Sequence, residues 1–404
     1  MDRRTFLAGM GAALLSGGLA LKNRCVDAAT PPIKNLPPLA DQETRVFLAG
    51  VAKGAGEESI KAAVREAASA ASDFSWLSKG DSVFIKPALN SGRPYPSTSS
   101  PTAIAAMVRL LKDKGARRVI VGDMSGIEYV KLTATGLTGS TRKLMESSGM
   151  AQAVLAAGGE LHFFEEEGWS AFYEDPMECA THWKRGLMMP NILKEVDHIV
   201  LMPRSSRHVL AGATLGLKAA VGYWRTDTRL EYHRDAASLQ EKTAEANTAR
   251  TLIQKQRLVI SAADKILTTF GPDRGYVYQP EIGLIIASES VAAHDMVSLA
   301  WLLENRDRIP SGEKKRFIDT NPLLARLANY WVVYKLGGLR PTLTADPLTK
   351  NAWKSIWDDR VLNRAYQVFG ARVPKVRLLD ANHKMPIPLR ERLAGMVTPL
   401  FPKG

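Results

Sequence analysis

The sequence is poor in cysteine and contains no hydrophobic run long enough to cross a membrane. Only two of its 404 residues are cysteines, and Cys25 lies in an amino-terminal segment that we expect to be removed. Cys179 would then remain alone, which excludes an internal disulfide, a cysteine-ligated iron–sulfur cluster and a zinc knuckle. A spanning helix needs about 20 apolar residues, so we expect no membrane span in the mature chain. Its stability must come from a hydrophobic core, and 45% of the chain is hydrophobic.

Several motifs of catalysis and nucleotide binding are also missing. The sequence has no Gly-x-Ser-x-Gly elbow, no Gly-x-Gly-x-x-Gly loop and no evident pair of sugar-cleaving carboxylates. The segment Gly212–Lys218 is not an ATP-binding loop, because its glycine-to-lysine spacing is wrong and no Ser or Thr follows the lysine. We interpret it as a small-residue helix packed on a sheet with Lys218 at the rim, or as a backbone that approaches an anion closely.

The first residues have the pattern of a twin-arginine export signal. Arg3 and Arg4 precede a weakly hydrophobic, glycine-containing stretch from Phe6 to Leu21. Small residues suit cleavage after Ala28, although an uncleaved signal acting as a tether is the alternative. We therefore expect the twin-arginine translocase as a partner and a location in the periplasm or elsewhere outside the cytoplasm.

The chain is basic, with a formal net charge of +13. Removing residues 1–28 takes away four basic and two acidic side chains, so the net charge becomes +11. This balance favours anionic ligands or surfaces through electrostatic steering. Export makes a nucleic-acid partner a poor choice, so a small anionic molecule is the expected ligand.

Hydrophobic periodicity predicts alternating strands and helices. The expected strands are 45–48, 82–86, 118–122, 160–164, 198–202, 265–269 and 283–287, and the expected helices are 58–71, 101–114, 150–157, 191–195, 236–255 and 291–303. Pro101 after two serines marks a helix start, and Gly115 marks its end. The pattern predicts an α/β fold with a mostly parallel sheet and helices on both faces.

The composition divides the chain into four parts. These are a signal peptide (1–28), a Pro-rich linker (29–43), an α/β domain (44–306) and a helical, Trp-rich C-terminal extension (307–404) that ends in a strand near 375–379. We expect the extension to pack on the domain without folding independently.

Several short segments resemble an uncharacterised family, the domain of unknown function 362. They are Val83–Asn90, Glu195–Pro203, Thr214–Lys218, Phe270–Gly275, and Leu284–Ser288 with Ala292–Asp295. The resemblance covers roughly residues 45–305 and implies an α/β domain, sometimes with iron–sulfur segments, without an established reaction. This chain lacks those cysteines. It also has Ala88 and Ala219 where the family has asparagine, and Ser206-Arg207-His208 where the family has Lys-Thr-His.

Candidate site residues follow the predicted strands, because ligands of parallel sheets bind beyond the carboxyl ends of the strands. Lysine and arginine there can hold a carboxylate or phosphate. We nominate as ligand-binding residues Lys86, Asn90, Asp123, Arg207, Lys218 and Asp295, and as acid/base catalysts His208 and His233. The alternatives are a solvated Lys86, an Asp123 that only caps a turn through Ser125, and histidines that are structural.

No cofactor is assigned. A bound metal ion remains an alternative, since His208 and His233 with Asp295 or His294 would give three ligands. The sequence has no helical His-x-x-x-His pair, which is the usual local signal of such a site. The aromatic and basic block from Tyr223 to Arg234 is interpreted as a flap over the crevice or a solvated loop. We therefore consider two functions, an exported enzyme acting on a small anionic substrate and a non-catalytic protein that binds an anion or a metal ion. We expect the candidate residues to meet in one positively charged crevice, where neighbouring lysines depress the proton affinity of the histidines.

Overall fold

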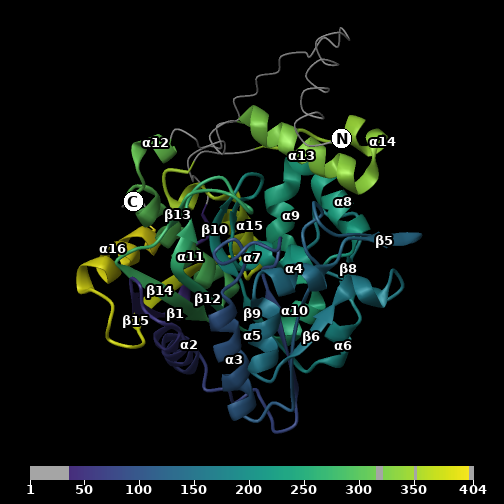
Figure 1. Ribbon diagram of the computed structural model, residues 1–404. Helices are drawn as coiled ribbons and strands as arrows, with labels where there is room; N and C mark the ends of the chain where they lie inside the picture. Colours follow the sequence, from purple (N-terminus) through teal and green to yellow (C-terminus); the bar gives the residue numbers. More distant parts are fainter. Residues whose placement is uncertain (1–35, 315–321, 350–352, 400–404) are drawn as a thin grey trace. The chain divides into compact units, whose positions relative to one another are not determined.

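The computed structural model describes residues 36–314, 322–349 and 353–399 (Figure 1). The expected signal peptide and the first part of the expected linker lie outside these residues. Asn35–Gly404 form one compact unit. Within the described ranges, no helix has both the length and the apolar character that a membrane crossing requires.

A mostly parallel sheet forms the centre of this unit. Its main path runs in the spatial order β15 (Val373–Asp380), β1 (Leu39–Ala52), β14 (Ile282–Ser288), β12 (Gln256–Leu267), β9 (His198–Met202), β2 (Ser82–Pro87), β3 (Arg118–Asp123) and β6 (Glu160–Phe163). Neighbours on this path are parallel except at β14, which is antiparallel to both β1 and β12. The predicted α/β class with a mostly parallel sheet is confirmed.

The order of the strands reverses between β2 and β9. From β2 the chain moves outward through α3 (Pro101–Asp113) to β3, and then through α4 (Thr141–Ser147) and α5 (Met150–Ala156) to β6. It later returns to the other side of β2 with β9 and continues outward to β12. Lys86 of β2 is level with Leu201 of β9, so both strands end at the same edge. In open α/β sheets, ligands bind at such a reversal, beyond the carboxyl ends of the strands.

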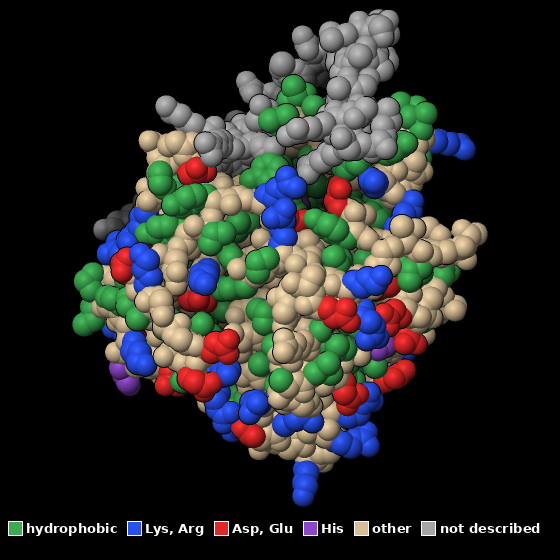
Figure 2. All heavy atoms as spheres, in the orientation of Figure 1, with side chains coloured by type: hydrophobic (Ala, Val, Ile, Leu, Met, Phe, Trp, Pro, Cys, Tyr) green, Lys and Arg blue, Asp and Glu red, His purple; other side chains and the backbone are tan. Residues whose placement is uncertain are grey.

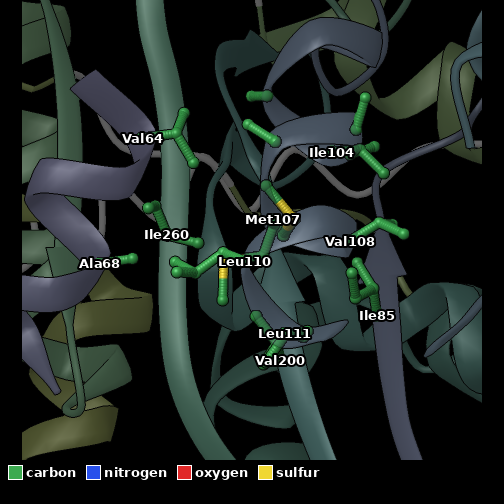
Figure 3. Packing of buried hydrophobic residues seen from close by; sticks show 14 of the residues in the cluster. Val64, Ala68, Ile85, Ile104, Met107, Val108, Leu110, Leu111, Val200 and Ile260 are labelled. Atoms are coloured by element: carbon green, nitrogen blue, oxygen red, sulfur yellow. The ribbon is translucent and has the colours of Figure 1, made fainter. Parts of the chain in front are cut away.

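Hydrophobic layers cover both faces of the sheet. Figure 3 shows α2 (Glu57–Ala71) and α3 packing their apolar side chains around Ile85, Val200 and Ile260, all of which are fully buried. On the other face lie α11 (Val291–Arg306), α15 (Arg360–Val368) and α16 (Ile387–Val397). The central strands are therefore almost continuous hydrophobic runs, as expected for strands that are covered on both sides.

The first and last described strands of this unit pair at one edge of the sheet. β1 begins at Leu39, inside the segment expected to be a linker, and it pairs in parallel with β15, so that Leu39 lies opposite Val373. The C-terminal part therefore contributes an edge strand to the central sheet as well as helices.

The helix expected at 236–255 is wrong as a continuous element. The chain forms α9 (Leu239–Glu245) and α10 (Arg250–Lys255), separated by the short turn η4 (Ala246–Thr248). Side chains in this turn bond to backbone oxygens: Thr248 donates to Glu245 and Cys179, and Asn247 donates to Leu217 and Thr243. Such bonds compete with helix continuation. The strand expected at 265–269 likewise begins earlier, at Gln256.

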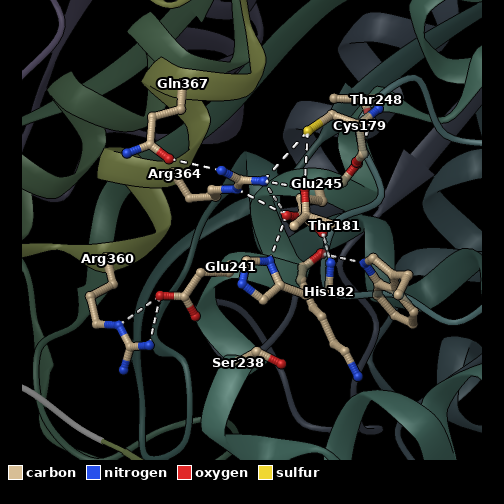
Figure 4. A network of polar contacts seen from close by, with 12 residues as sticks. Cys179, Thr181, His182, Ser238, Glu241, Glu245, Thr248, Arg360, Arg364 and Gln367 are labelled. Atoms are coloured by element: carbon tan, nitrogen blue, oxygen red, sulfur yellow. Dashed lines mark hydrogen bonds and ion pairs between the residues drawn. The ribbon is translucent and has the colours of Figure 1, made fainter.

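A buried carboxylate connects α9 to the C-terminal helix α15 (Figure 4). The side chain of Glu245 is fully buried, and its Oε1 lies 2.5 Å from Nη2 of Arg364 and 2.6 Å from Nδ1 of His182. The backbone N–H of His182 donates to Oε2 at 3.0 Å. A second ion pair, Glu241 with Arg360 at 2.6 Å, joins the same two helices.

We predict that Glu245→Gln lowers the free energy of unfolding by about 3 kcal/mol, because it leaves Arg364 without a charged partner in a largely desolvated site. Urea unfolding followed by circular dichroism would measure this loss. The matched control is Glu160→Gln, which breaks an exposed pair with Arg118 and should cost no more than about 1 kcal/mol. Equal losses in the two variants would contradict the prediction.

Candidate functional site

A buried ion pair joins the ends of β2 and β3. The side chain of Lys86 is 1% exposed, and its Nζ lies 3.0 Å from Oδ1 of Asp123. Nζ also donates to the carbonyl oxygen of Pro87 at 2.7 Å. Asp123 accepts backbone N–H groups from Leu89 at 3.0 Å and Met124 at 2.8 Å. Burial lowers the pKa of Lys86, and the charge of Asp123 opposes that shift.

Gly222 allows a second layer of chain to lie directly on this pair. It belongs to η2 (Ala220–Tyr223), and a Cβ atom at this position would overlap Oδ1 of Asp123 and Nζ of Lys86. The ring of Tyr223 is centred 5.2 Å from Nζ of Lys86. η2 therefore covers the ion pair. Its close approach requires glycine at position 222, because any side chain there would overlap the pair.

Lys218 lies beside this pair without a carboxylate of its own. It belongs to α7 (Gly216–Ala219), its side chain is partly exposed, and its Nζ is 5.8 Å from the ring centre of Tyr232. Among the residues that the structure describes, none forms a hydrogen bond or ion pair with the Lys218 amine. Burial, followed by the charges of Arg229, Arg204 and Lys86, lowers the pKa of Lys218 to about 7.

Two buried arginines complete a cluster of positive charge, which we call the cation cluster: Lys86, Arg204, Lys218 and Arg229. Arg229 is 4% exposed and donates to the carbonyl oxygens of Ser125 and Met124, both at 2.6 Å. Arg204 is 1% exposed and donates to the carbonyl oxygen of Ser97. Burial lowers the pKa of each arginine to about 10. These carbonyl oxygens are neutral, so they do not cancel the positive charges of the two guanidinium groups.

Carboxylates compensate the cation cluster only in part. Asp123 is paired with Lys86 and its charge also acts on Arg229, while Glu165 acts on Arg229 and Asp273 on Arg204 through their fields alone. No carboxylate raises the pKa of Lys218. The cation cluster therefore has a surplus of buried positive charge around the Lys218 amine.

Buried donors without partners lie on the segments that carry the cation cluster or adjoin it. Within the described part of the chain, Nε of Arg204 and the hydroxyl groups of Ser206, Thr214 and Tyr223 have no hydrogen-bond partner. Ser206 and Thr214 face each other across the β10 (Arg204–His208) and β11 (Gly212–Thr214) pair. Buried polar groups are almost always hydrogen-bonded, so such a concentration of unpaired donors calls for an explanation.

His233 lies near the cation cluster and is held neutral. It is 8% exposed, its Nδ1 lies 2.9 Å from Oδ1 of Asn329, and its carbonyl oxygen accepts from Nδ2 of Asn329 at 2.8 Å. Burial lowers the pKa of His233 to about 3, and the charges of Lys218 and Arg229 contribute to that shift. An imidazole with so low a pKa is a weak base at neutral pH.

Arg207 and His208 are held by contacts of a different kind. Nδ1 of His208 accepts the backbone N–H groups of Leu210 at 3.1 Å and Ala211 at 3.2 Å. The neutral ring therefore carries its proton on Nε2. The guanidinium of Arg207 lies 3.9 Å from the ring centre of Trp353, in the C-terminal part. These contacts shape the β10–β11 turn.

Asp295 fixes the start of α7. Its two oxygens accept the backbone N–H groups of Gly216 at 2.8 Å and Leu217 at 2.7 Å. His294 lies behind it, with Nδ1 2.9 Å from Asp295 and Nε2 2.9 Å from the hydroxyl of Ser261. All three side chains are almost fully buried, so we interpret this Ser–His–Asp chain as a support for α7 and Lys218.

Asn90 lies farther along the same edge of the sheet. Its Nδ2 donates to Oδ1 of Asp273 at 2.6 Å, which ties it to the loop after β12. The structure thus brings Lys86, Asp123, Lys218 and His233 into one neighbourhood, while Asp295 supports that neighbourhood from the backbone side. The other three candidates contact other groups: Asn90 contacts Asp273, Arg207 contacts Trp353, and His208 contacts the backbone of Leu210 and Ala211.

A cavity opens between α7, α11 and α15. It contains about 280 Å³ of empty space, including its opening to solvent, and Lys218, Asp295 and Asp359 are its charged lining residues. Asp359 is 5% exposed, and burial raises its pKa to about 7, with the charge of Asp295 adding to that shift. Within the described ranges, no group of three or more His, Cys, Asp or Glu residues could hold a metal ion.

The sequence pattern did not mark three residues of this neighbourhood. Arg204 stands directly after the β9 segment, so the strand-end argument could have found it. Arg229 lies in the block interpreted as a flap or loop, which is wrong: α8 (Thr226–Arg234) is helical, and Tyr223, Trp224 and Tyr232 are fully buried. Asp359 had no local signal, because it comes from the C-terminal part.

We predict that His233 makes the protein less stable in mild acid. The unfolded imidazole takes up a proton below its ordinary pKa of 6.5, whereas the folded one stays neutral until about pH 3. The unfolded state therefore binds more protons between these values, and His233 lowers stability by about 2 kcal/mol on going from pH 7 to pH 5. Urea unfolding at both pH values would measure this loss of stability. It should be absent in His233→Gln and unchanged in His383→Gln, which alters an exposed histidine. The same pH dependence in both variants would refute it.

Comparisons with known proteins give a family and distant structural likenesses. A lactate racemase apoprotein from Thermoanaerobacterium thermosaccharolyticum matches with 13% sequence identity and a TM-score of 0.37, over 63% of this chain and 58% of its own. This chain therefore spans less than two thirds of that structure. A search of curated proteins gives no match. The model of the family described as domain of unknown function (DUF362) matches residues 83–300. Because this match covers more than half of the 404 residues, the chain belongs to that family.

Proposed function

We propose that this chain binds a small anionic molecule at the carboxyl edge of its sheet, beside Lys218. The observation that carries the proposal is the surplus of buried positive charge in the cation cluster, where only Lys86 has a paired carboxylate. Burying unpaired charge is costly, and an anionic ligand would offset that cost. The cluster also lies where the strand order reverses, which is the usual ligand position in such sheets.

The unpaired donors around the cluster support a ligand that is rich in oxygen acceptors. A carboxylate or phosphate group accepts several hydrogen bonds at once, and arginine and lysine are the usual side chains that hold such groups. Acidic and basic side chains are interspersed over the face shown in Figure 2, so the described residues on that face form no large basic patch that would bind an anion instead.

We favour an enzyme over a non-catalytic binding protein. Lys218 and Asp359 line the same cavity and have pKa values of about 7, which suits acid/base work at neutral pH. His233 is a weaker choice for that role than the sequence suggested, because its pKa is about 3, and Nδ1 of His208 is occupied by two backbone N–H groups. The alternative is a protein that captures an anion, or a metal ion, without turnover.

We also propose that the protein acts outside the cytoplasm. The support is the arginine pair before a weakly hydrophobic stretch at the amino terminus. In this proposal the twin-arginine translocase delivers the chain already folded, with any ligand already bound.

Lys218→Ala should weaken the binding of a small anion by roughly 10-fold or more, because a charged hydrogen bond contributes about 1.5–3 kcal/mol. Titration calorimetry with inorganic phosphate and with pyruvate would measure this, and added salt should weaken binding further. Lys53→Ala is the control, since Lys53 pairs with Glu281 on the surface. Unchanged binding in Lys218→Ala would contradict the proposed site, and mass spectrometry of the native exported protein would identify a ligand that copurifies.

Replacing Arg3 and Arg4 with lysine should keep the protein in the cytoplasm, because the arginine pair is the element that the translocase recognises. Cell fractionation with immunodetection would measure this. Lys22→Arg, a change behind the apolar stretch, is the control that should export normally. Undiminished export of the double variant would overturn the proposed route.

A further inference from the structure

The backbone that carries Lys218 is fixed by buried groups. Asp295 accepts the backbone N–H groups of Gly216 and Leu217, the two residues before Lys218. His294 contacts Asp295 in turn, and Ser261 contacts His294. α7 therefore presents the Lys218 side chain from a rigid base. Groups that react covalently with a ligand need such fixed placement.

Lys218 differs from the other lysines of the interior in the partners of its amine. Lys86 is 1% exposed and paired with Asp123 at 3.0 Å. Lys242 is fully buried and lies 3.4 Å from Oδ2 of Asp235 and 3.9 Å from Oε1 of Glu231. Lys218 has cations and the face of Tyr232 as neighbours, and it is partly exposed, so that a ligand can reach it.

We propose that Lys218 is a nucleophile that forms an imine with the carbonyl group of a small oxo acid. The inference rests on the proposed anion site, because the cation cluster would hold the carboxylate of such a molecule. The carbonyl carbon of a 2-oxo acid is bonded directly to that carboxylate. A carboxylate held at Arg204, whose Nε has no hydrogen-bond partner among the described residues, would therefore bring the carbonyl carbon toward the Lys218 amine.

The step balances without an oxidant or reductant. The lone pair of Lys218 Nζ forms a bond to the carbonyl carbon, and the π electrons of the carbonyl move to its oxygen, which takes a proton. The resulting carbinolamine takes up a second proton and loses its oxygen as water while nitrogen forms the double bond, and the protons on nitrogen return to the solvent or to a base. One amine and one carbonyl give one imine and one water.

The electrostatics of the cavity support this chemistry. A lysine with its ordinary pKa is neutral in only roughly one of a few thousand molecules at pH 7. The pKa of Lys218 is about 7, so about half of its amines are neutral there. Asp359 lines the same cavity, and its pKa of about 7 leaves it protonated in part of the molecules. It can therefore supply the proton that the departing oxygen needs.

Reductive trapping tests the inference. The full chain is incubated with pyruvate and cyanoborohydride, digested and mapped by mass spectrometry. We expect the reduced adduct on Lys218, with half of the maximal labelling rate near pH 7, and little on Lys242, which serves as an internal control for buried lysines. Lys218→Arg keeps the positive charge but should lose the adduct, whereas Lys53→Arg should keep it. Inorganic phosphate, which competes for the cation cluster, should slow the trapping.

The outcomes separate the inference from the proposed function. If pyruvate and phosphate bind in calorimetry but no adduct forms on Lys218, the imine is wrong and the anion site stands. If neither anion binds and no adduct forms, both fail. Labelling spread evenly over exposed lysines would also overturn the imine. The adduct map of the unmodified protein decides the question even if Lys218→Arg does not fold.

Discussion

The ion pair between Lys86 and Asp123 is the interaction on which the candidate site depends. It joins two strand ends that are 37 positions apart in sequence, and it is closed to solvent on all sides by buried chain. Its oxygen atoms also accept two backbone N–H groups, so it sets the course of the chain after both strands. Gly222 rests on the pair, and through η2 it sets the start of α8 and with it Arg229. Losing either partner would leave an uncompensated buried charge, which is costly.

This arrangement explains why Lys218 has an unusual environment. Among the described residues, Asp123 is the carboxylate that forms an ion pair within the cation cluster, and its partner there is Lys86. Arg229 is held by carbonyl oxygens, which accept from its N–H groups without removing its charge, and Arg204 keeps an Nε that has no partner among the described residues. The remaining field acts on Lys218 and lowers its pKa to about 7. Apolar side chains in place of these charges would often make an interior equally or more stable.

The C-terminal part belongs to the same compact unit as the sheet. It supplies the edge strand β15, the Trp353 ring over Arg207, and Asp359 at the cavity. Glu245 and Glu241 hold α15 against α9 through ion pairs with Arg364 and Arg360 (Figure 4). The cavity therefore has walls from both the family domain and the segment that follows it, and the neighbours of Lys218 are set by both.

The sequence by itself determined the class of fold and most of its strands, because apolar periodicity is local and the helix caps are local. It also marked Lys86, Asp123 and Lys218, since residues after parallel strands lie at one edge of the sheet. Tertiary structure alone decided which of these residues meet. Whether Lys86 or Lys218 forms the ion pair with Asp123 depends on distances across the sheet. No local sequence pattern indicates those distances. His233 and Asp359 have shifted pKa values only because distant segments, around Asn329 and α7, bury them. The break in the helix at 246–248 has the same origin, since Asn247 bonds to Leu217 and Thr248 to Cys179.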